Sequence, residues 1–199
     1  MAKHITYQGK PAQLIVDSKS CNQFVMESIQ TDSLPEGALC RLFGTYAFMD
    51  ETNRNSRSYD FDNYFAQVQS LQPKIAAKRL LGELEHCKRR VVKYANVSHR
   101  IDSIEWNPKR KAFEGWITIF NTPAGQTAYA IVSAGSPLFI SSRAIGIVNP
   151  QTKKVNILKL ITFDLVAEPG FYDAEFSIAS TQKQLNSMPV AINESKDMM

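Results

Sequence analysis

The sequence contains few cysteines and histidines and lacks long apolar segments. Its three cysteines are an odd number and include no Cys-x-x-Cys pair, so we expect neither a disulfide framework nor a structural zinc site. No apolar run approaches the roughly 18 residues of a membrane-spanning helix, and the first residues lack the apolar core of a signal peptide. These absences predict a soluble, intracellular protein that needs no metal or cofactor.

Charge is also modest, and this argues against a specialised binder. Lys and Arg total 23 against 19 for Asp and Glu, a formal net charge of +4 that is too small to predict dedicated nucleic-acid binding. The 199 residues are 44% hydrophobic and 21% charged, a composition typical of one globular domain with a sizeable core.

The composition divides the chain into three parts. Residues 1–36 mix short apolar and polar stretches and end in a turn-like sequence, which indicates a propeptide-like leader that is flexible or adds a strand. Residues 177–199 are polar without a sustained apolar face, which indicates a mobile tail. The folded domain is therefore expected at residues 37–176.

Within this domain, strand patterns outnumber helical ones. Apolar residues three or four apart after residue 64 predict two helical pieces broken around Pro73, and a short helix is predicted to end at Gly135. We therefore predict an α+β fold, a mostly antiparallel sheet or barrel surrounded by helices. The residues expected in strands are 38–49, several between 91 and 106, 112–120, 138–148 and 155–166.

Three histidines leave few choices for a general base. His4 lies in the leader and is a poor candidate. His86 follows the helical pattern where strand patterns begin, and such element ends commonly carry catalytic groups. An imidazole with a pKa of about 6.5 accepts a hydroxyl proton at neutral pH. A purely structural role for His86 is the alternative.

A hydroxyl pair provides the best candidate nucleophile. An apolar run leads into Ser141 and Ser142, followed by Arg143, and a serine at the exposed end of a strand can be activated by a neighbouring base. The alternative is that both serines only end a strand while Arg143 forms a surface ion pair.

Asp164 interrupts an apolar stretch that is expected to form a buried strand. Such a carboxylate must be paired, because an unpaired buried charge costs several kcal/mol. A histidine would satisfy it, which is the arrangement of the orienting acid in a catalytic triad. An arginine such as Arg143 would satisfy it equally well, so the residues alone leave both partners open.

Several segments together match a known pattern in their order and spacing. The segments are GELEH at residues 82–86, VSHRI at 97–101, ISSR at 140–143 and FDLVAEP at 163–169, and an asparagine-rich loop precedes them at residues 53–59. Together they resemble the prohead core proteases of tailed bacteriophages over about residues 38–176.

This resemblance implies a serine endopeptidase with a fold related to the herpesvirus assemblins, a β-barrel ringed by helices. It assigns His86 as the base, Ser141 as the nucleophile and Asp164 as the orienting acid. Ser142 and Arg143 would support the loop that supplies oxyanion donors. His99 lies in another matching segment and competes with His86 for the role of base.

The resemblance also implies substrates and location. We expect cleavage after glutamate in scaffold or core proteins, in the major capsid protein and in the enzyme itself, inside the immature capsid in the host cytoplasm. Self-association is expected. Glu194 lies in a matching self-cleavage sequence and Glu27 in a looser one, whereas Glu83 also matches but is expected inside the folded domain.

Two other functions remain open. The chain could be a non-catalytic scaffold or capsid assembly protein that retains the protease fold. It could also bind nucleic acid through a cationic run that includes Arg89, Arg90 and Lys93. Strand alternation would divide these charges between two faces, which favours an acidic scaffold partner over nucleic acid.

Overall fold

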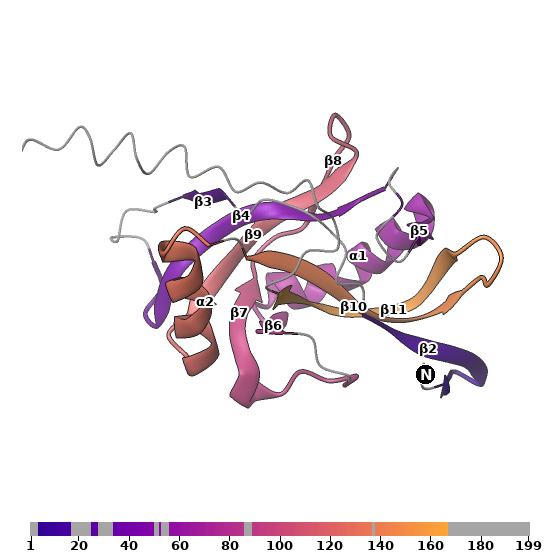
Figure 1. The fold of residues 1–199 in the computed structure, drawn as a ribbon, viewed down its shortest axis with the longest axis horizontal. Helices are drawn as coiled ribbons and strands as arrows, with labels where there is room; N and C mark the ends of the chain where they lie inside the picture. The colour runs from indigo at the N-terminus through magenta and orange to yellow at the C-terminus, as the bar shows by residue number, and fades with distance from the viewer. Residues whose placement is uncertain are drawn as a thin grey trace, which may run out of the picture.

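The described residues of the chain form two β-sheets and two α-helices (Figure 1). The computed structural model describes residues 4–16, 25–27, 34–49, 52, 56–85, 89–136 and 138–166. Within these ranges, no helix combines the length and apolar character needed to cross a membrane.

The first sheet is built around a long antiparallel hairpin, β10 with β11, whose strands pair along almost their full length. A hairpin from the leader, β1 with β2, extends this sheet because β2 pairs with β10. The short strand β5 pairs in parallel with β11 at the other edge. In order across the sheet, the strands are β1 (His4–Tyr7), β2 (Lys10–Val16), β10 (Phe139–Val148), β11 (Lys154–Val166) and β5 (Ser58–Tyr59).

The second sheet is antiparallel, and its centre is the pair of long strands β4 and β9. The strand β8 (Glu105–Asn107) also pairs with β9. Across the sheet, the order is β3 (Val25–Glu27), β4 (Ala38–Phe48), β9 (Ala112–Phe120), β7 (Val97–Ile101) and β6 (Leu81–Glu83).

Apolar side chains from both sheets form one core. Tyr46 of β4 and Phe163 of β11 meet edge to face with ring centroids 4.7 Å apart, a favoured aromatic geometry. Leu42, Ile117 and Ile140 are fully buried in the same cluster. Burial of these apolar surfaces is what holds the two sheets together.

The helix α1 (Phe61–Ala76) packs its apolar side against this core and protects an edge of β11. The Asn63 side chain accepts a hydrogen bond from Ile157 N at 2.8 Å and donates one to Ile157 O at 3.0 Å. Gln67 Oε1 accepts from Leu160 N at 3.0 Å. These side chains form hydrogen bonds with backbone N–H and C=O groups of β11 that would otherwise pair with a neighbouring strand.

The prediction of two helical pieces around Pro73 is wrong. One helix runs through Pro73, which lies in its last turn, where the loss of a single amide donor interrupts little of the helix. Leu80 and Leu84 follow the helix as residues beside β6, so their helical spacing was coincidental.

The predicted barrel is also corrected, because the described residues form two sheets and no closed barrel. Only an isolated parallel bridge, Leu84 with Leu165, links the sheets through β-type pairing in this part of the chain. The α1 side chains protect the edge of β11 that barrel closure would have to use. The α+β class is confirmed.

Most strand predictions are confirmed, including the four long strands β4, β9, β10 and β11. The second helix, α2 (Pro123–Ser133), begins after Thr122, whose hydroxyl caps it by accepting from Gly125 N at 3.1 Å. Its predicted end is confirmed by Gly135 at φ +79°. Val91 was expected in a strand but lies in an exposed loop.

Candidate active site

Ser141 and Asp164 are direct register partners on β10 and β11. Residues that lie opposite one another in an antiparallel pair project to the same face, with Cα atoms about 4.5–5.5 Å apart. The pairing therefore brings together two of the three predicted catalytic residues, although they are separated by more than twenty positions in the sequence.

The expectation that the nucleophile lies at an exposed strand end is wrong for this conformation. Ser141 has 0% exposure, and β10 continues from it to Val148. The strand extends past the serine pair because β11 pairs with it on one side and β2 on the other. Any reagent or peptide that reaches Ser141 must first displace what covers it.

Ser142 and Arg143 follow on opposite faces of β10, since adjacent strand residues alternate. Arg143 therefore shares the face of Ser141, whereas Ser142 projects to the face of its neighbour Ile140. Arg143 has 0% exposure, so the predicted alternative of a surface ion pair is wrong.

Arg143 joins two buried carboxylates. Its Nη2 lies 2.8 Å from Asp164 Oδ1 and 2.8 Å from Glu83 Oε2, and all three side chains have 0% exposure. Asp164 Oδ1 also accepts a hydrogen bond from Glu83 N at 3.1 Å. Thus Arg143, one of the two partners that the sequence allows for Asp164, is its partner in this structure, and the charges compensate one another away from water.

The same network holds the segment between β6 and β7. Glu83 Oε1 accepts from Arg89 Nη2 at 3.1 Å and from Lys93 N at 2.8 Å. Arg143 Nη1 donates to Arg89 O at 3.3 Å and lies 3.5 Å from Val91 O. The buried side chains of Glu83 and Arg143 therefore hold this segment where it leads back to the second sheet.

His86 belongs to this segment but lies outside the described residues. Its preceding neighbour, Glu85, donates its backbone N–H to Leu165 O at 2.7 Å. Glu85 also has φ +66°, a left-handed conformation that is uncommon for a residue with a Cβ. The chain is thus anchored to β11 beside Asp164 at the last described residue before His86.

His99, the competing base, lies deep in the protein with 0% exposure. The Ser98 hydroxyl lies 2.9 Å from its Nδ1, while its Nε2 has no hydrogen-bond partner among the described residues. Burial lowers its pKa to about 4, although the nearby Asp164 carboxylate and Phe163 carbonyl oppose that shift. His99 is therefore neutral at pH 7 and a weak proton acceptor in this conformation.

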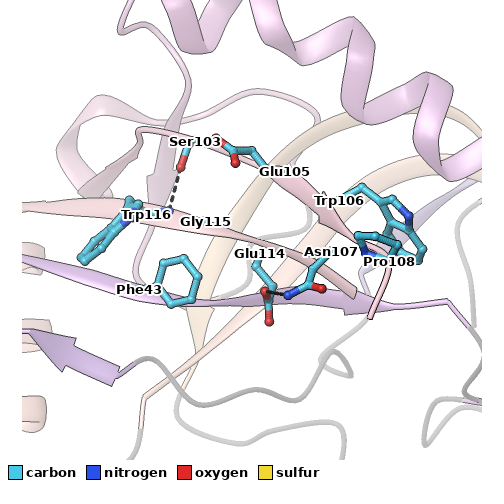
Figure 2. Close-up of a pocket in the computed structure, with 9 residues that line it drawn as sticks. All are labelled: Phe43, Ser103, Glu105, Trp106, Asn107, Pro108, Glu114, Gly115 and Trp116. Carbon is cyan, nitrogen blue, oxygen red and sulfur yellow. Dashed lines mark hydrogen bonds between the residues drawn. The ribbon is translucent and has the colours of Figure 1, made fainter. Parts of the chain in front are cut away.

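A surface hollow of about 310 Å³ lies on the outer side of β4, β8 and β9 and contains none of the predicted catalytic residues (Figure 2). Its buried carboxylate, Glu114, accepts from Asn107 Nδ2 at 2.7 Å and is ion-paired with Arg110. The Ser103 hydroxyl accepts from Trp116 N at 3.1 Å. These polar groups are satisfied by the protein itself, so the hollow offers few free groups for binding or catalysis.

Neither a metal cluster nor an activated thiol competes with Ser141 in the described part of the chain. Across the described ranges, no three His, Cys, Asp or Glu side chains are grouped so that they could hold an ion. The buried Cys40 has its pKa raised to about 12 by burial, so it is a poor thiolate nucleophile. Ser141 is thus the candidate nucleophile with a neighbouring acid.

Sequence reasoning missed the structural role of Glu83 and treated it only as a possible cleavage match. Its expected position inside the folded domain is confirmed, because its side chain has 0% exposure. The available signal was a carboxylate between the apolar residues Leu81 and Leu84, since a buried acid needs a cationic partner. The partner itself could not be read from the sequence.

The described part of the chain thus combines an α+β fold with a buried serine that lies opposite a buried acid on one hairpin. A family model described as "Prohead core protein serine protease" matches residues 6–172. The chain belongs to this family of prohead core proteases.

The solved structure of the bacteriophage T4 capsid assembly protease, gp21, has a similar fold. It aligns with a TM-score of 0.64 and 21% sequence identity, covering 79% of this chain and 99% of that chain. No curated protein is significantly similar in sequence. The structural similarity supports the fold, and the family match places the chain among the prohead core protein serine proteases.

Proposed function

We propose that the chain is a serine endopeptidase that cleaves scaffold and capsid proteins during prohead maturation. Ser141 is the nucleophile, His86 the general base and Asp164 the acid that orients the imidazole. The observation that carries this assignment is the direct pairing of Ser141 with Asp164 across β10 and β11. With a hydroxyl and a carboxylate on one face of the β10–β11 hairpin, a histidine is the residue that would complete a catalytic triad.

The anchoring of Glu85 supports His86 as that histidine. Glu85 N is bonded to Leu165 O, one residue from Asp164, and consecutive Cα atoms are about 3.8 Å apart. This anchor supports the choice of His86, the next residue along the chain. His99 is the weaker candidate because its pKa is lowered to about 4.

In this mechanism the imidazole takes the Ser141 proton as the hydroxyl oxygen attacks the scissile carbonyl carbon, and it then gives the proton to the leaving amine. The acyl-enzyme is released by water through the same base. Arg143 acts indirectly, by holding Asp164 and the loop that follows His86. Backbone N–H groups near Ser142 are the proposed oxyanion donors.

The buried state of Ser141 requires an opening step before catalysis. The leader is the proposed cover, because β2 pairs with β10 from Arg143 to Gly146, beginning two residues from Ser141. In this assignment residues 1–36 act as a propeptide-like segment and residues 37–176 as the protease domain. Residues 177–199, outside the described part of the chain, form a tail with Glu194 as its cleavage site.

Cleavage after glutamate, self-association and action inside the immature capsid in the host cytoplasm complete the proposal. The expected substrates are scaffold or core proteins and the major capsid protein, which accords with the family description. A relationship to herpesvirus assemblins is part of the same proposal.

The test is incubation of a purified candidate scaffold protein with wild type and single variants, followed by fragment sequencing and labelling with a serine-directed fluorophosphonate. Ser141→Ala and His86→Ala should abolish cleavage, and fluorophosphonate should label Ser141. Ser133→Ala is the matched control, because it removes an exposed hydroxyl of α2 that has no role in the proposed site. Full activity in Ser141→Ala, or retained activity in His86→Ala with loss in His99→Ala, would contradict the assignment.

A non-catalytic assembly role is the second candidate, and the complete burial of Ser141 favours it. An assembly module would retain the buried Asp164–Arg143 pair for folding alone. In that case neither wild type nor leader-cleaved protein would react with fluorophosphonate or cut scaffold protein.

A further inference from the structure

A basic groove of about 330 Å³ lies where the end of α1, the strand β11 and the loop between β6 and β7 meet. Four exposed cationic side chains line it, and its lining includes no carboxylate among the described residues. Leu80 and Ile161 contribute buried apolar surface to the same groove. The cationic residues are Lys74, Arg79, Arg90 and Lys159.

These four cations are not neutralised by the described part of the protein. Other arginines on this side have carboxylate partners, such as Arg89 with Glu83 and Arg143 with Asp164. No ion pair joins the four groove cations to a carboxylate within the described ranges. Their charges therefore act together on a ligand in the groove.

The groove also carries two unusually exposed apolar side chains. Tyr94 is 81% exposed and Val91 is 68% exposed, the highest values for large hydrophobic residues in the described ranges. Exposed apolar groups beside unpaired cations are characteristic of protein interaction surfaces, where tyrosine and arginine are enriched. The exposure of Tyr94 and Val91 is a separate observation from the lack of ion pairs among the four cations.

The groove is connected directly to the candidate catalytic loop. Arg90 and Val91 belong to the segment whose carbonyls face Arg143, and Arg143 holds Asp164. Lys159 lies five positions before Asp164 on β11, which corresponds to about 17 Å of extended chain. A bound segment would thus lie a few residues away from a peptide bond held at Ser141.

We propose that this groove is a substrate-docking site for an acidic, extended protein segment that also carries apolar residues. The carboxylates would pair with the four cations, and the apolar side chains would cover Tyr94 and Val91. This role rests on the proposed protease function, because it places a substrate segment next to the catalytic loop. It adds a recognition requirement beyond the residue at the scissile bond.

An acidic peptide fits the groove better than nucleic acid does. The groove has a volume of about 330 Å³, and apolar residues line it together with the four cations, whereas nucleic-acid binding usually uses a long stripe of phosphate contacts. The net charge of +4 is too small for the chain as a whole to exert a strong long-range attraction on a polyanion.

Binding can be measured without catalysis by using the Ser141→Ala protein. Fluorescence anisotropy would follow a labelled peptide of alternating glutamate and leucine, with a glutamine–leucine peptide and a single-stranded DNA of equal charge as comparison probes. The test variant is Arg79→Gln with Lys159→Gln. The matched control is Lys109→Gln with Lys153→Gln, which removes the same charge from exposed hairpin turns.

We expect the acidic peptide to bind and the glutamine peptide not to bind. The groove variant should weaken binding about tenfold, as expected for losing two contacts of about 0.7 kcal/mol each, while the control binds as the parent does. Part of the peptide binding should persist at high salt, and Tyr94→Ala should weaken that part. Equal loss in the control variant, or tighter binding of DNA with the same sensitivity to the groove variant, would overturn the proposal.

The outcomes also separate this proposal from the protease assignment. Specific peptide binding by a protein that shows no cleavage would retain the groove and reject the enzyme. Cleavage of scaffold protein without any peptide binding would retain the enzyme and reject the groove.

Discussion

Arg143 holds Asp164 through a 2.8 Å contact between Nη2 and Oδ1, and neither side chain has access to solvent. The same nitrogen contacts Glu83, whose second oxygen is paired with Arg89 at 3.1 Å. Two carboxylates and two guanidinium groups therefore alternate in one cluster beside Ser141. The balance of charge in this cluster therefore affects both the stability of the fold and the geometry of the candidate site.

Replacing Arg143 with methionine should be strongly destabilising. The change leaves Asp164 buried without its cation, and breaking a buried pair in this way costs about 3–5 kcal/mol. Urea unfolding monitored by circular dichroism measures the loss. Arg41→Met is the control, because Arg41 is 35% exposed in its 3.5 Å pair with Asp102 and should cost at most about 1 kcal/mol. Equal losses in the two variants would show that the buried cluster adds nothing to stability.

The sequence predicted the elements that carry Ser141 and Asp164 because the local signals were strong. Apolar and β-branched residues on both sides of a turn predict a hairpin, and its two strands are β10 and β11. Local patterns also identified Asp164 as a buried acid that needs a partner. The sequence alone could not choose between histidine and Arg143, because that choice depends on which side chains meet after folding.

Long-range features were harder to predict. The pairing of β2 with β10 and the capping of β11 by Asn63 join residues far apart in the chain, and no local periodicity encodes either. Glu83 was missed for the same reason, since its partners Arg89 and Arg143 come from a loop and another sheet. The burial of Ser141 results from the same kind of long-range contact, so the sequence did not predict it.

His99 should make stability depend on pH in the acidic range. Its folded pKa is lowered from 6.5 to about 4, chiefly by burial, so the unfolded chain binds a proton between these values and the folded chain does not. The stabilisation is complete above about pH 7 and declines as pH falls from about 6.5 to about 4, by roughly 3 kcal/mol in total.

Urea unfolding of wild type and His99→Gln at about pH 7.5 and about pH 4.5 isolates this contribution. Carboxylates also titrate in this range, but they are common to both proteins. We expect wild type to lose more stability on acidification than the variant does. Identical losses would mean that His99 titrates normally in the folded protein.

Gly82→Ala should disrupt the contact between β6 and the His99 ring. A Cβ at this position would lie 2.3 Å from His99 Nε2 and 2.2 Å from Phe163 O, and the backbone oxygen cannot rotate away. Overpacking of this kind costs about 1–3 kcal/mol or more.

Gly9→Ala is the control for this substitution. Gly9 has φ +73°, but a methyl group added there would meet no atom within 4 Å, so the variant tests backbone strain alone. Thermal unfolding should rank Gly82→Ala as clearly the less stable of the two. The reverse order would show that β6 can move away from β11.

Removing residues 1–16 should make Ser141 more reactive toward fluorophosphonate. The deletion takes away β2, which pairs with β10 from Arg143 to Gly146, and frees that edge for an incoming peptide strand. If β2 holds the site closed, lowering the free energy of opening by about 1.4 kcal/mol would increase labelling about tenfold.

Deletion of residues 1–7 is the matched control, since it removes β1 and leaves β2 in place. The longer deletion also removes Ile15, which is 1% exposed, so circular dichroism must first establish a temperature at which both proteins are folded. Labelling that rises only with loss of β2 would identify the leader as the cover. If both deletions label at the wild-type rate, the barrier to Ser141 must lie in another segment, because the β10 edge would then be free and the serine still inaccessible.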